Sequence, residues 1–400
     1  MPLRSDDAMY VNAMGLATPI GIGKQAAAAA LFAGTRDGFV PNDVLPGVAG
    51  PVGRVRGPLP EIPAALSHLA SRNNRMAMAA LAEIEGDVAV AAARFGARRI
   101  AVVLGTSTSG MAEGEAALGQ RLTAGQWPRG FEYRQQELGS LAEFVAAYLH
   151  LEGPAYVVAS ACSSSGQVFA SAQRLMRTGV CDAAVVGGVD TLCALTLAGF
   201  SSLEALSPTG CNPFSANRNG ITIGEGGAMF LISGTPSEIR LLGVGESTDA
   251  HHVSAPDPSG KGARLAMSRA LAAAGLQPSD VGYINLHGTA TPLNDAMESK
   301  AVAELFGTAV PCSSTKAMTG HTLGAAGAIE AAFLWLTLHP RFNPEGVLPP
   351  HLWDGVADPE LPRLNLVTPG TRWAPGARHI GLSNSFAFGG SNVAVIMGTA

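Results

Sequence analysis

The stretch Val158-Ala159-Ser160-Ala161-Cys162-Ser163-Ser164-Ser165-Gly166 decides the fold of this chain. Its apolar, β-branched start predicts the end of a strand, and the amphipathic pattern from Gln167 to Arg177 predicts a helix directly after it. A strand that stops at a thiol and turns at once into a helix places the sulfur of Cys162 at a helix N-terminus. Peptide dipoles and free N–H groups there favour the thiolate, so Cys162 is a candidate nucleophile. For such a residue taken alone, a buried structural cysteine is the more common interpretation.

The composition indicates a soluble protein with a large interior. The chain has 400 residues, of which 47% are hydrophobic and 14% charged, whereas charged residues make up about 25% of a typical domain. At roughly 150 residues per domain, two or more packed units are expected. The net charge of −5 and the lack of a basic run interleaved with aromatic residues argue against nucleic-acid binding.

The cysteines predict neither a disulfide framework nor a zinc site. Their number is odd and no two have C-x-x-C spacing, which favours a reducing compartment, and we expect a cytoplasmic protein without a metal site. The acidic, polar start does not resemble a signal peptide, and the apolar run 26–33 is too short to span a bilayer, so no membrane insertion is expected. The five cysteines are Cys162, Cys181, Cys193, Cys211 and Cys312.

Short apolar strands alternate with Ala-rich helical patterns almost throughout, which predicts an α/β fold with buried sheets. Strands are expected over residues 100–104, 155–160, 183–187, 228–233, 240–247, 281–286 and 392–397. Helices are expected over residues 23–33, 74–95, 138–149, 166–178, 260–274, 295–306 and 324–339.

The chain also shows signs of two related halves. Gly224-Glu225-Gly226-Gly227 and Gly389-Gly390-Ser391 each precede an apolar strand, and small-residue turns at Cys162 and His321 each lead into an Ala-rich helix. With the seam at Thr235-Pro236-Ser237, we expect an N-terminal half over 1–234 that carries the cysteine and a C-terminal half over 235–400. Glycine before a strand is common, so the repeat is weak evidence alone. It predicts chemistry where the halves meet.

Two segments of the second half carry candidate chemistry. In Asn285-Leu286-His287-Gly288-Thr289-Ala290-Thr291-Pro292 a strand ends at a histidine, and in Lys316-Ala317-Met318-Thr319-Gly320-His321 a lysine precedes another. Both histidines lie at strand-to-helix corners, where α/β folds place their sites. Either histidine alone could be a structural hydrogen-bond partner. A metal site is not favoured, because no third ligand lies at metal-site spacing.

Together these motifs resemble the β-ketoacyl-acyl-carrier-protein synthases of the Cys-His-His type. Cys162 stands in Ala-Cys-Ser-Ser, His287 in His-Gly-Thr-x-Thr-Pro, and Lys316 with His321 in Lys-x-x-x-Gly-His. The resemblance runs through nearly the whole chain and closes with Asn384-Ser385-Phe386-Ala387-Phe388-Gly389-Gly390. It implies the thiolase fold, a five-layered αβαβα arrangement of two pseudo-symmetric halves that is usually dimeric.

The resemblance implies a decarboxylative condensation without a cofactor, on substrates carried by the phosphopantetheine of an acyl carrier protein. Cys162 would hold the acyl primer as a thioester, and the N–H groups of Cys162 and Phe388 would form the oxyanion hole. His287 and His321 would stabilise the enolate that forms when a malonyl thioester loses CO₂. Lys316 and Glu330 would support the charge network of the site.

The resemblance also assigns residues around the nucleophile. Thr289 and Thr291 match residues that bind the phosphopantetheine arm, and Phe388 matches a gate over the cysteine. Three further residues match a mobile loop beside that gate: Asp249, His252 and Ser254. Thr108 matches the loop that lines the acyl pocket and would leave the pocket open to long chains, although a simple Ser/Thr-rich turn explains it equally well.

Several positions depart from the family pattern. Ala387 replaces a usual glycine, and its Cβ should restrict the gate. Around Arg218 the usual acidic residues are absent, so we expect no local ion pairs there; the replacements are Ser215, Asn217 and Asn219. Arg72 and Arg75 either receive an acidic carrier protein or belong to a solvated helix face.

Two other protein classes are alternatives to a condensing enzyme. A thiolase that uses coenzyme A would have a second cysteine near the C-terminus, and none follows Cys312. A non-catalytic chain-length partner would lack the nucleophile. We therefore expect an acyltransferase of a bacterial aryl-polyene or polyketide-like pathway, with primary fatty-acid elongation as the alternative. Its expected partners are an acyl carrier protein and a second subunit, as a homodimer or as a heterodimer with a chain-length-factor-like homologue.

Overall fold

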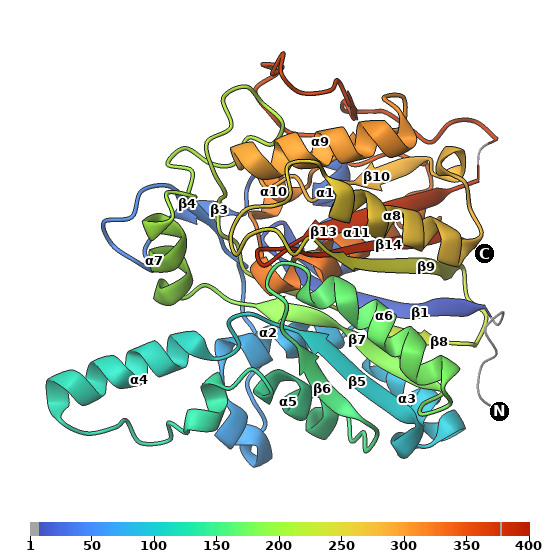
Figure 1. Ribbon diagram of the computed structural model, residues 1–400. Helices are drawn as coiled ribbons and strands as arrows, with labels where there is room; N and C mark the ends of the chain where they lie inside the picture. The colour runs from blue at the N-terminus through green and yellow to red at the C-terminus, as the bar shows by residue number, and fades with distance from the viewer. Residues whose placement is uncertain (1–7, 377) are drawn as a thin grey trace.

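The strands of the computed structural model, which describes residues 8–376 and 378–400, form one mixed sheet with an internal repeat (Figure 1). Its strands are β1 (Met9–Thr18), β2 (Gly21–Ile22), β5 (Ile100–Gly105), β6 (Ala155–Val158), β7 (Ala183–Asp190), β8 (Gly226–Ser233), β9 (Ile239–Thr248), β10 (Tyr283–Asn285), β11 (Pro311–Ser313), β12 (Asn365–Leu366), β13 (Ile380–Phe386) and β14 (Ser391–Thr399). Their order is β12-β11-β10-β13-β14-β9-β1-β8-β7-β5-β6, with β2 beside β1. A separate hairpin pairs β3 (Phe39–Pro41) with β4 (Pro51–Gly53).

The two parts of this sheet repeat each other strand for strand. The series β1-β8-β7-β5-β6 and β9-β14-β13-β10-β11 both begin with two antiparallel pairings and continue with two parallel ones. An antiparallel pairing of β1 with β9, which sets Met9 opposite Leu241, joins the two series. The repeat confirms two pseudo-symmetric halves, while their division at residue 235 stays a prediction.

The helices form three layers around the two halves of the sheet (Figure 1). They are α1 (Lys24–Ala33), α2 (Arg72–Leu81), α3 (Glu85–Phe95), α4 (Met111–Ala124), α5 (Ser140–Tyr148), α6 (Ser164–Arg177), α7 (Ala194–Ser202), α8 (Lys261–Ala274), α9 (Pro292–Phe306), α10 (Lys316–Thr319) and α11 (Ala326–Leu338). Helices α6 and α11 share the largest core cluster with strands of both halves, whereas α2, α3 and α5 cover one outer face and α8 and α9 the other. The five layers are those of the thiolase fold, as predicted.

The central helices α6 and α11 meet at two glycines. A Cβ on Gly327 would lie 2.7 Å from the backbone nitrogen of Gly166, and a Cβ on Gly166 would lie 2.5 Å from Cγ1 of Val393. Because neither position has room for a side chain, the first turns of both helices approach closely. Cys162 and His321 precede these turns, so the glycine contact brings their segments together.

Most predicted elements are present with boundaries shifted by a few residues, but the single helix over 74–95 is wrong. Helix α2 ends at Leu81 and α3 begins at Glu85. Within the break, both carboxylate oxygens of Glu83 accept the backbone N–H of Lys24, at the start of α1. A hydrogen bond between segments distant in the sequence therefore outweighs the helical pattern of residues 74–95. Among the longer elements, the sequence pattern missed β1, β13, α4 and α7.

No helix in the described part of the chain is both long and apolar enough to cross a membrane.

Candidate active site

Cys162 lies in a strained turn between β6 and α6. The preceding residue, Ala161, has a φ of 51°, in the left-handed region that side chains rarely occupy. The hydroxyl of Ser164 holds this turn, because it accepts the N–H of Ser160 and donates to the carbonyl of Ala161. Cys162 is only 6% exposed. The expected strand–thiol–helix arrangement is thus present, with strain concentrated beside the sulfur.

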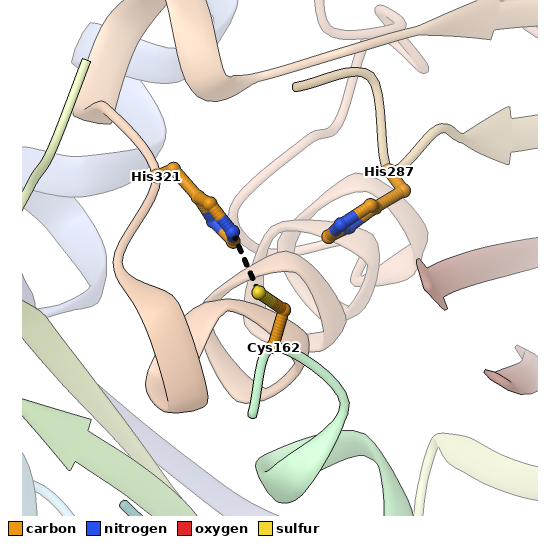
Figure 2. Close-up of side chains that lie close together, drawn as sticks. All are labelled: Cys162, His287 and His321. Carbon is orange, nitrogen blue, oxygen red and sulfur yellow. Dashed lines mark hydrogen bonds between the residues drawn. The ribbon is translucent and has the colours of Figure 1, made fainter. Parts of the chain in front are cut away.

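His321 lies in direct contact with this thiol. Its Nε2 is 3.0 Å from Sγ of Cys162, as Figure 2 shows. The backbone of His321 is fixed by the first half of the chain, since its N–H donates to the carbonyl of Thr222 and its carbonyl accepts the N–H of Gly224. The glycine segment that suggested a repeat in the sequence therefore also positions a histidine of the second half.

His287 reaches the same point from the end of β10. Sγ of Cys162 and one ring nitrogen of each histidine all lie within 4.8 Å of one another, and both imidazoles point toward the sulfur (Figure 2). Lys316 Nζ lies 3.3 Å from Nδ1 of His287. An ammonium group can only donate, so Nδ1 accepts and Nε2 carries the hydrogen. The same three atoms are close enough to hold a metal ion, so the expected absence of a metal site stays a prediction.

Lys316 is itself held by a buried ion pair with Glu330. Their side chains are 1% and 3% exposed, and the Lys316 ammonium also donates to the backbone carbonyl of His287. Burial raises the pKa of Glu330 to about 7, although the charge of Lys316 opposes this rise. The pair thus connects the orientation of His287 to a charge balance deep in the core.

Burial sets the resting protonation states of the site. It lowers the pKa of His287 and of His321 well below the ordinary value, and the charge of Lys316 adds to both effects. It also raises the pKa of Cys162 to about 11, outweighing Lys316 and the nearby N–H groups. The thiolate expected from the helix N-terminus is therefore wrong for the resting state, in which a thiol faces two neutral imidazoles at neutral pH.

The N–H groups expected to form an oxyanion hole lie beside the sulfur. Those of Phe388 and of Cys162 itself are both within hydrogen-bonding reach of Sγ and lower the pKa of the thiol. The ring of Phe388 packs against Phe200, with centroids 5.7 Å apart. Phe200 comes from α7, which the sequence pattern missed.

A cavity of about 330 Å³ leads to the cysteine. Its walls combine both histidines with most of the residues assigned by resemblance: Thr289, Thr291, Asp249, Ser254 and Phe388. The hydroxyls of Thr289 and Thr291 lie 3.0 Å apart. Asp249 joins the loop after β9 to the start of β14, because its carboxylate accepts from the amide of Asn392 and its N–H donates to the carbonyl of Gly390.

Thr108 and His252 line neither of the two described cavities that reach Cys162. Thr108 is buried; its hydroxyl donates to the carboxylate of Asp190 and accepts the N–H of Thr191. A second cavity, of about 320 Å³, lies beside Cys162, and the residue of this loop that lines it is Ser107. Because the side chain of Thr108 is buried against Asp190, it does not support the assignment of Thr108 to the acyl pocket. His252 is exposed, and its Nδ1 accepts the N–H of Ser254 rather than facing the cavity.

Buried acids that the sequence analysis missed hold the functional loops. Glu298, on α9, accepts the N–H groups of His287 and Gly288, and its burial raises its pKa to about 7. Asp190 accepts from the loop 106–108 and from the N–H of Ala325, just before α11. In the sequence these acids look like any others, because neither the burial nor the bonding partners of a carboxylate can be read from its letter.

Three departures from the family pattern have structural outcomes. Ala387 does not have a positive φ, so its Cβ introduces no backbone strain. The expected lack of an ion pair at Arg218 is wrong, since Asp358 from a distant segment pairs with it at 2.5 Å. Arg72 is bound to the buried Glu225, and Arg75 to Glu61 and two backbone carbonyls, so neither guanidinium is simply solvated.

Comparisons with known proteins agree with this geometry. Residues 55–236 match the N-terminal domain and residues 239–352 the C-terminal domain of β-ketoacyl synthases. A ketosynthase (ApeO) solved in complex with its chain length factor (ApeC) from Xenorhabdus doucetiae is 45% identical, with a TM-score of 0.92 over 98% of both chains. The chain belongs to the β-ketoacyl synthase family.

Other relatives of this β-ketoacyl synthase family member are more distant. The ishigamide ketosynthase/chain length factor structure is 27% identical, with a TM-score of 0.87 over 98% of this chain and 99% of the other. A mitochondrial 3-oxoacyl-[acyl-carrier-protein] synthase of Arabidopsis thaliana is 37% identical over 61% of this chain and 56% of its own length. A synthase 2 of Staphylococcus aureus is 35% identical over 63% of this chain and 65% of its own. The match spans less than two thirds of these curated relatives.

Proposed function

We propose that this protein joins an acyl primer, held as a thioester on Cys162, to a malonyl thioester with loss of CO₂, giving a β-ketoacyl thioester. Both substrates would arrive on the phosphopantetheine of an acyl carrier protein, and no separate cofactor is needed. The observation that carries the proposal is the convergence of one sulfur and two imidazole nitrogens within 4.8 Å in a cavity of a β-ketoacyl synthase family member.

The first step is transfer of the acyl group to the enzyme. The sulfur of Cys162 attacks the carbonyl of the acyl thioester while its proton passes toward His321, whose Nε2 is 3.0 Å away. The N–H groups of Cys162 and Phe388 face the developing oxyanion, and the carrier leaves as a free thiol after it takes up that proton.

The second step is decarboxylation of the malonyl thioester. The bond to the carboxylate breaks, CO₂ leaves, and the electron pair forms an enolate whose oxygen needs hydrogen-bond donors. His287 offers Nε2–H, because Lys316 occupies its Nδ1. His321 has given its transferred proton to the first carrier, and it offers the second donor once its remaining hydrogen has moved from Nδ1 to Nε2. Both histidines stay neutral because burial lowers their pKa values, so they donate without competing protonation.

The third step forms the carbon–carbon bond. The enolate carbon attacks the acyl carbonyl on Cys162, the same two N–H groups hold the tetrahedral oxyanion, and the sulfur is expelled and takes up a proton. The balance is one acyl thioester, one malonyl thioester and one proton in, and one β-ketoacyl thioester, one carrier thiol and one CO₂ out. No electron acceptor or metal ion is required.

Among the pathways in which such a reaction occurs, we favour an aryl-polyene or polyketide-like one over primary fatty-acid elongation. The support is the 45% identity to the ApeO ketosynthase over 98% of both chains. A cytoplasmic location is part of the same proposal and is supported by five cysteines that are all free thiols.

A second subunit is also proposed. Strand β6 lies at the open edge of the sheet, and an apolar groove of about 810 Å³ opens between α4 and α7. Several of its side chains are at least half exposed, which is typical of an interface: Leu118, Trp127, Tyr133 and Leu195. Because two similar ketosynthase structures include a chain length factor, we favour a heterodimer with such a homologue. Light scattering on the protein with and without that homologue distinguishes it from a homodimer.

Mass spectrometry of the intact protein tests the proposal. Incubation with a panel of acyl carrier proteins should add one acyl group, and Cys162→Ala should abolish that addition while malonyl decarboxylation can continue. A matched Cys193→Ala variant should still be acylated. Condensation that survives Cys162→Ala would show that the nucleophile is assigned wrongly.

A further inference from the structure

His351 is a buried imidazole whose two ring nitrogens both have partners. It lies in the segment between α11 and β12 and is 4% exposed. Its Nδ1 accepts the backbone N–H of Ser314 across 3.1 Å, and its Nε2 lies 3.0 Å from the backbone carbonyl of Pro213. Because the first bond needs a bare Nδ1 and the second a hydrogen on Nε2, one neutral tautomer satisfies both partners. Burial lowers the pKa of His351 to about 4, so this neutral form prevails at neutral pH.

Ser314 connects His351 to both residues that set the position of His287. Its hydroxyl donates to the carbonyl of Gly288 across 2.7 Å and accepts the backbone N–H of Lys316 across 3.3 Å. Gly288 directly follows His287, and the ammonium of Lys316 lies 3.3 Å from Nδ1 of that histidine. A displacement of Ser314 would therefore move both the backbone beside the imidazole and the donor that fixes its tautomer.

The turn that begins at Gly288 is strained and depends on this support. The φ values are 39° at Gly288 and 67° at Ala290, and for the alanine this is a left-handed conformation that side chains rarely adopt. Strained backbone persists only where its surroundings hold it. Ser314 holds the end of the turn nearest His287, whereas the carboxylate of Asp295 accepts the N–H of Ala290 at the other end. Loss of the Ser314 contact would thus release the histidine end of the turn and leave the end beside the two threonines bound.

We propose that His351 is a positioning residue for decarboxylation, because through Ser314 it directs Nε2–H of His287 toward the enolate oxygen. The inference rests on the proposed function, since it takes His287 as one of the two donors to the enolate. His351 is not among the residues that line the two cavities beside Cys162, so it acts through its neighbours. Its loss should lower kcat for decarboxylation with little change in KM. Acylation of Cys162, which does not use the His287 donor, should change much less.

Two substitutions separate the two bonds of His351. The side-chain oxygen of asparagine occupies the same position as Nδ1, so His351→Asn can still accept the N–H of Ser314 but loses the bond to Pro213. The amide nitrogen of glutamine occupies the position of Nε2, so His351→Gln keeps the Pro213 bond and leaves the N–H of Ser314 without its acceptor. Release of labelled CO₂ from a malonyl thioester should fall about tenfold in His351→Gln and less than about threefold in His351→Asn. Packing alone predicts the reverse order, because glutamine is closer to histidine in volume.

Ser314→Ala tests the route of the effect. It removes the hydroxyl that binds Gly288 and Lys316, so it should slow decarboxylation about as much as His351→Gln. Adding His351→Gln to Ser314→Ala should cause less than about threefold further loss, because both substitutions break the same chain of bonds. Losses that multiply would show that His351 acts by another route and would overturn the inference.

His339→Gln is the matched control. Like that of His351, its imidazole packs against two aromatic rings, but it lies at the end of α11 opposite to His321, and its loss should change neither half-reaction. Decarboxylation in His351→Gln that equals or exceeds that in His351→Asn, or an equal loss of acylation, would refute the positioning role. Should His351→Gln fail to fold, Ser314→Ala against His351→Asn gives the same comparison. If the wild-type protein releases no CO₂, the proposed function itself fails.

Discussion

Lys316→Met should selectively disable decarboxylation. In the wild-type protein the Lys316 ammonium fixes the tautomer of His287, because it donates to Nδ1 across 3.3 Å and leaves the hydrogen on Nε2. Without that donor, His287 can place its hydrogen on Nδ1 and turn a bare nitrogen toward the enolate. The loss of one such donor costs about 3 to 4 kcal/mol of transition-state stabilisation, or roughly 10² to 10³ in rate.

The same variant should remain folded. An unpaired buried charge would cost about 3 to 5 kcal/mol, but the pKa of Glu330 is already raised to about 7 with Lys316 beside it. When the lysine is removed, Glu330 loses the charge that lowers its pKa and takes up a proton at neutral pH. The remaining cost is that of a poorly bonded neutral group, about 1 to 3 kcal/mol.

Two half-reactions measure the effect of Lys316→Met. Release of labelled CO₂ from a malonyl thioester reports decarboxylation, and the mass of the intact protein reports acylation of Cys162. Lys24→Met is the matched control, since Lys24 also contacts a glutamate, Glu83, but lies far from Cys162 in α1. If folded Lys316→Met keeps decarboxylation within about threefold of wild type, or loses acylation equally, the argument from the tautomer is refuted.

Three further predictions concern other parts of the molecule. His287→Ala and His321→Ala should each slow decarboxylation by about 10² to 10³ and acylation by less; the reverse order would contradict their roles. Glu298 has a pKa of about 7 in the folded protein, against an ordinary 4.5, so the native state favours its protonated form. The free energy of unfolding should therefore fall by about 3 kcal/mol as pH rises through this range. In urea unfolding, Glu298→Gln should lack this pH dependence, and an unchanged pH dependence would contradict the assignment. Gly166→Ala should lower stability by about 1 to 3 kcal/mol, because its Cβ would meet Val393 of β14 at 2.5 Å, whereas Gly86→Ala in α3 meets nothing within 4 Å. Equal melting temperatures would show that α6 can shift away from β14 at no cost.

The sequence predicted which candidate side chains come together because their motifs are local. Cys162, His287, Lys316 and His321 each lie in a short segment of small or polar residues at the end of a strand, and the structure brings all four together. Apolar alternation likewise placed most strands and helices. Strand β1 was not predicted because eight of its ten residues are buried, which removes the alternation of apolar and polar residues that marks a half-buried strand.

The missed features depend on tertiary contacts and burial, which the sequence pattern does not mark. Glu298 binds backbone N–H groups 10 and 11 residues away across a helix turn, and Asp190 binds a loop more than 80 residues before it. A buried carboxylate and a solvated one have the same letter in a sequence. The protonation of Cys162 was wrong for a related reason, since the sequence shows the helix N-terminus but not the burial that outweighs it.

The candidate nucleophile and the two imidazoles belong to different halves of a duplicated architecture, so the site is sensitive to how these halves are aligned. Cys162 follows β6 in one half, whereas His287 follows β10 and His321 follows α10 in the other. The 3.0 Å distance between Sγ of Cys162 and Nε2 of His321 therefore depends on how the halves are aligned. The short β1–β9 ladder and the glycine contact of α6 with α11 both contribute to that alignment. Mild denaturant or a bulky substitution at either junction should thus abolish turnover well before the chain unravels.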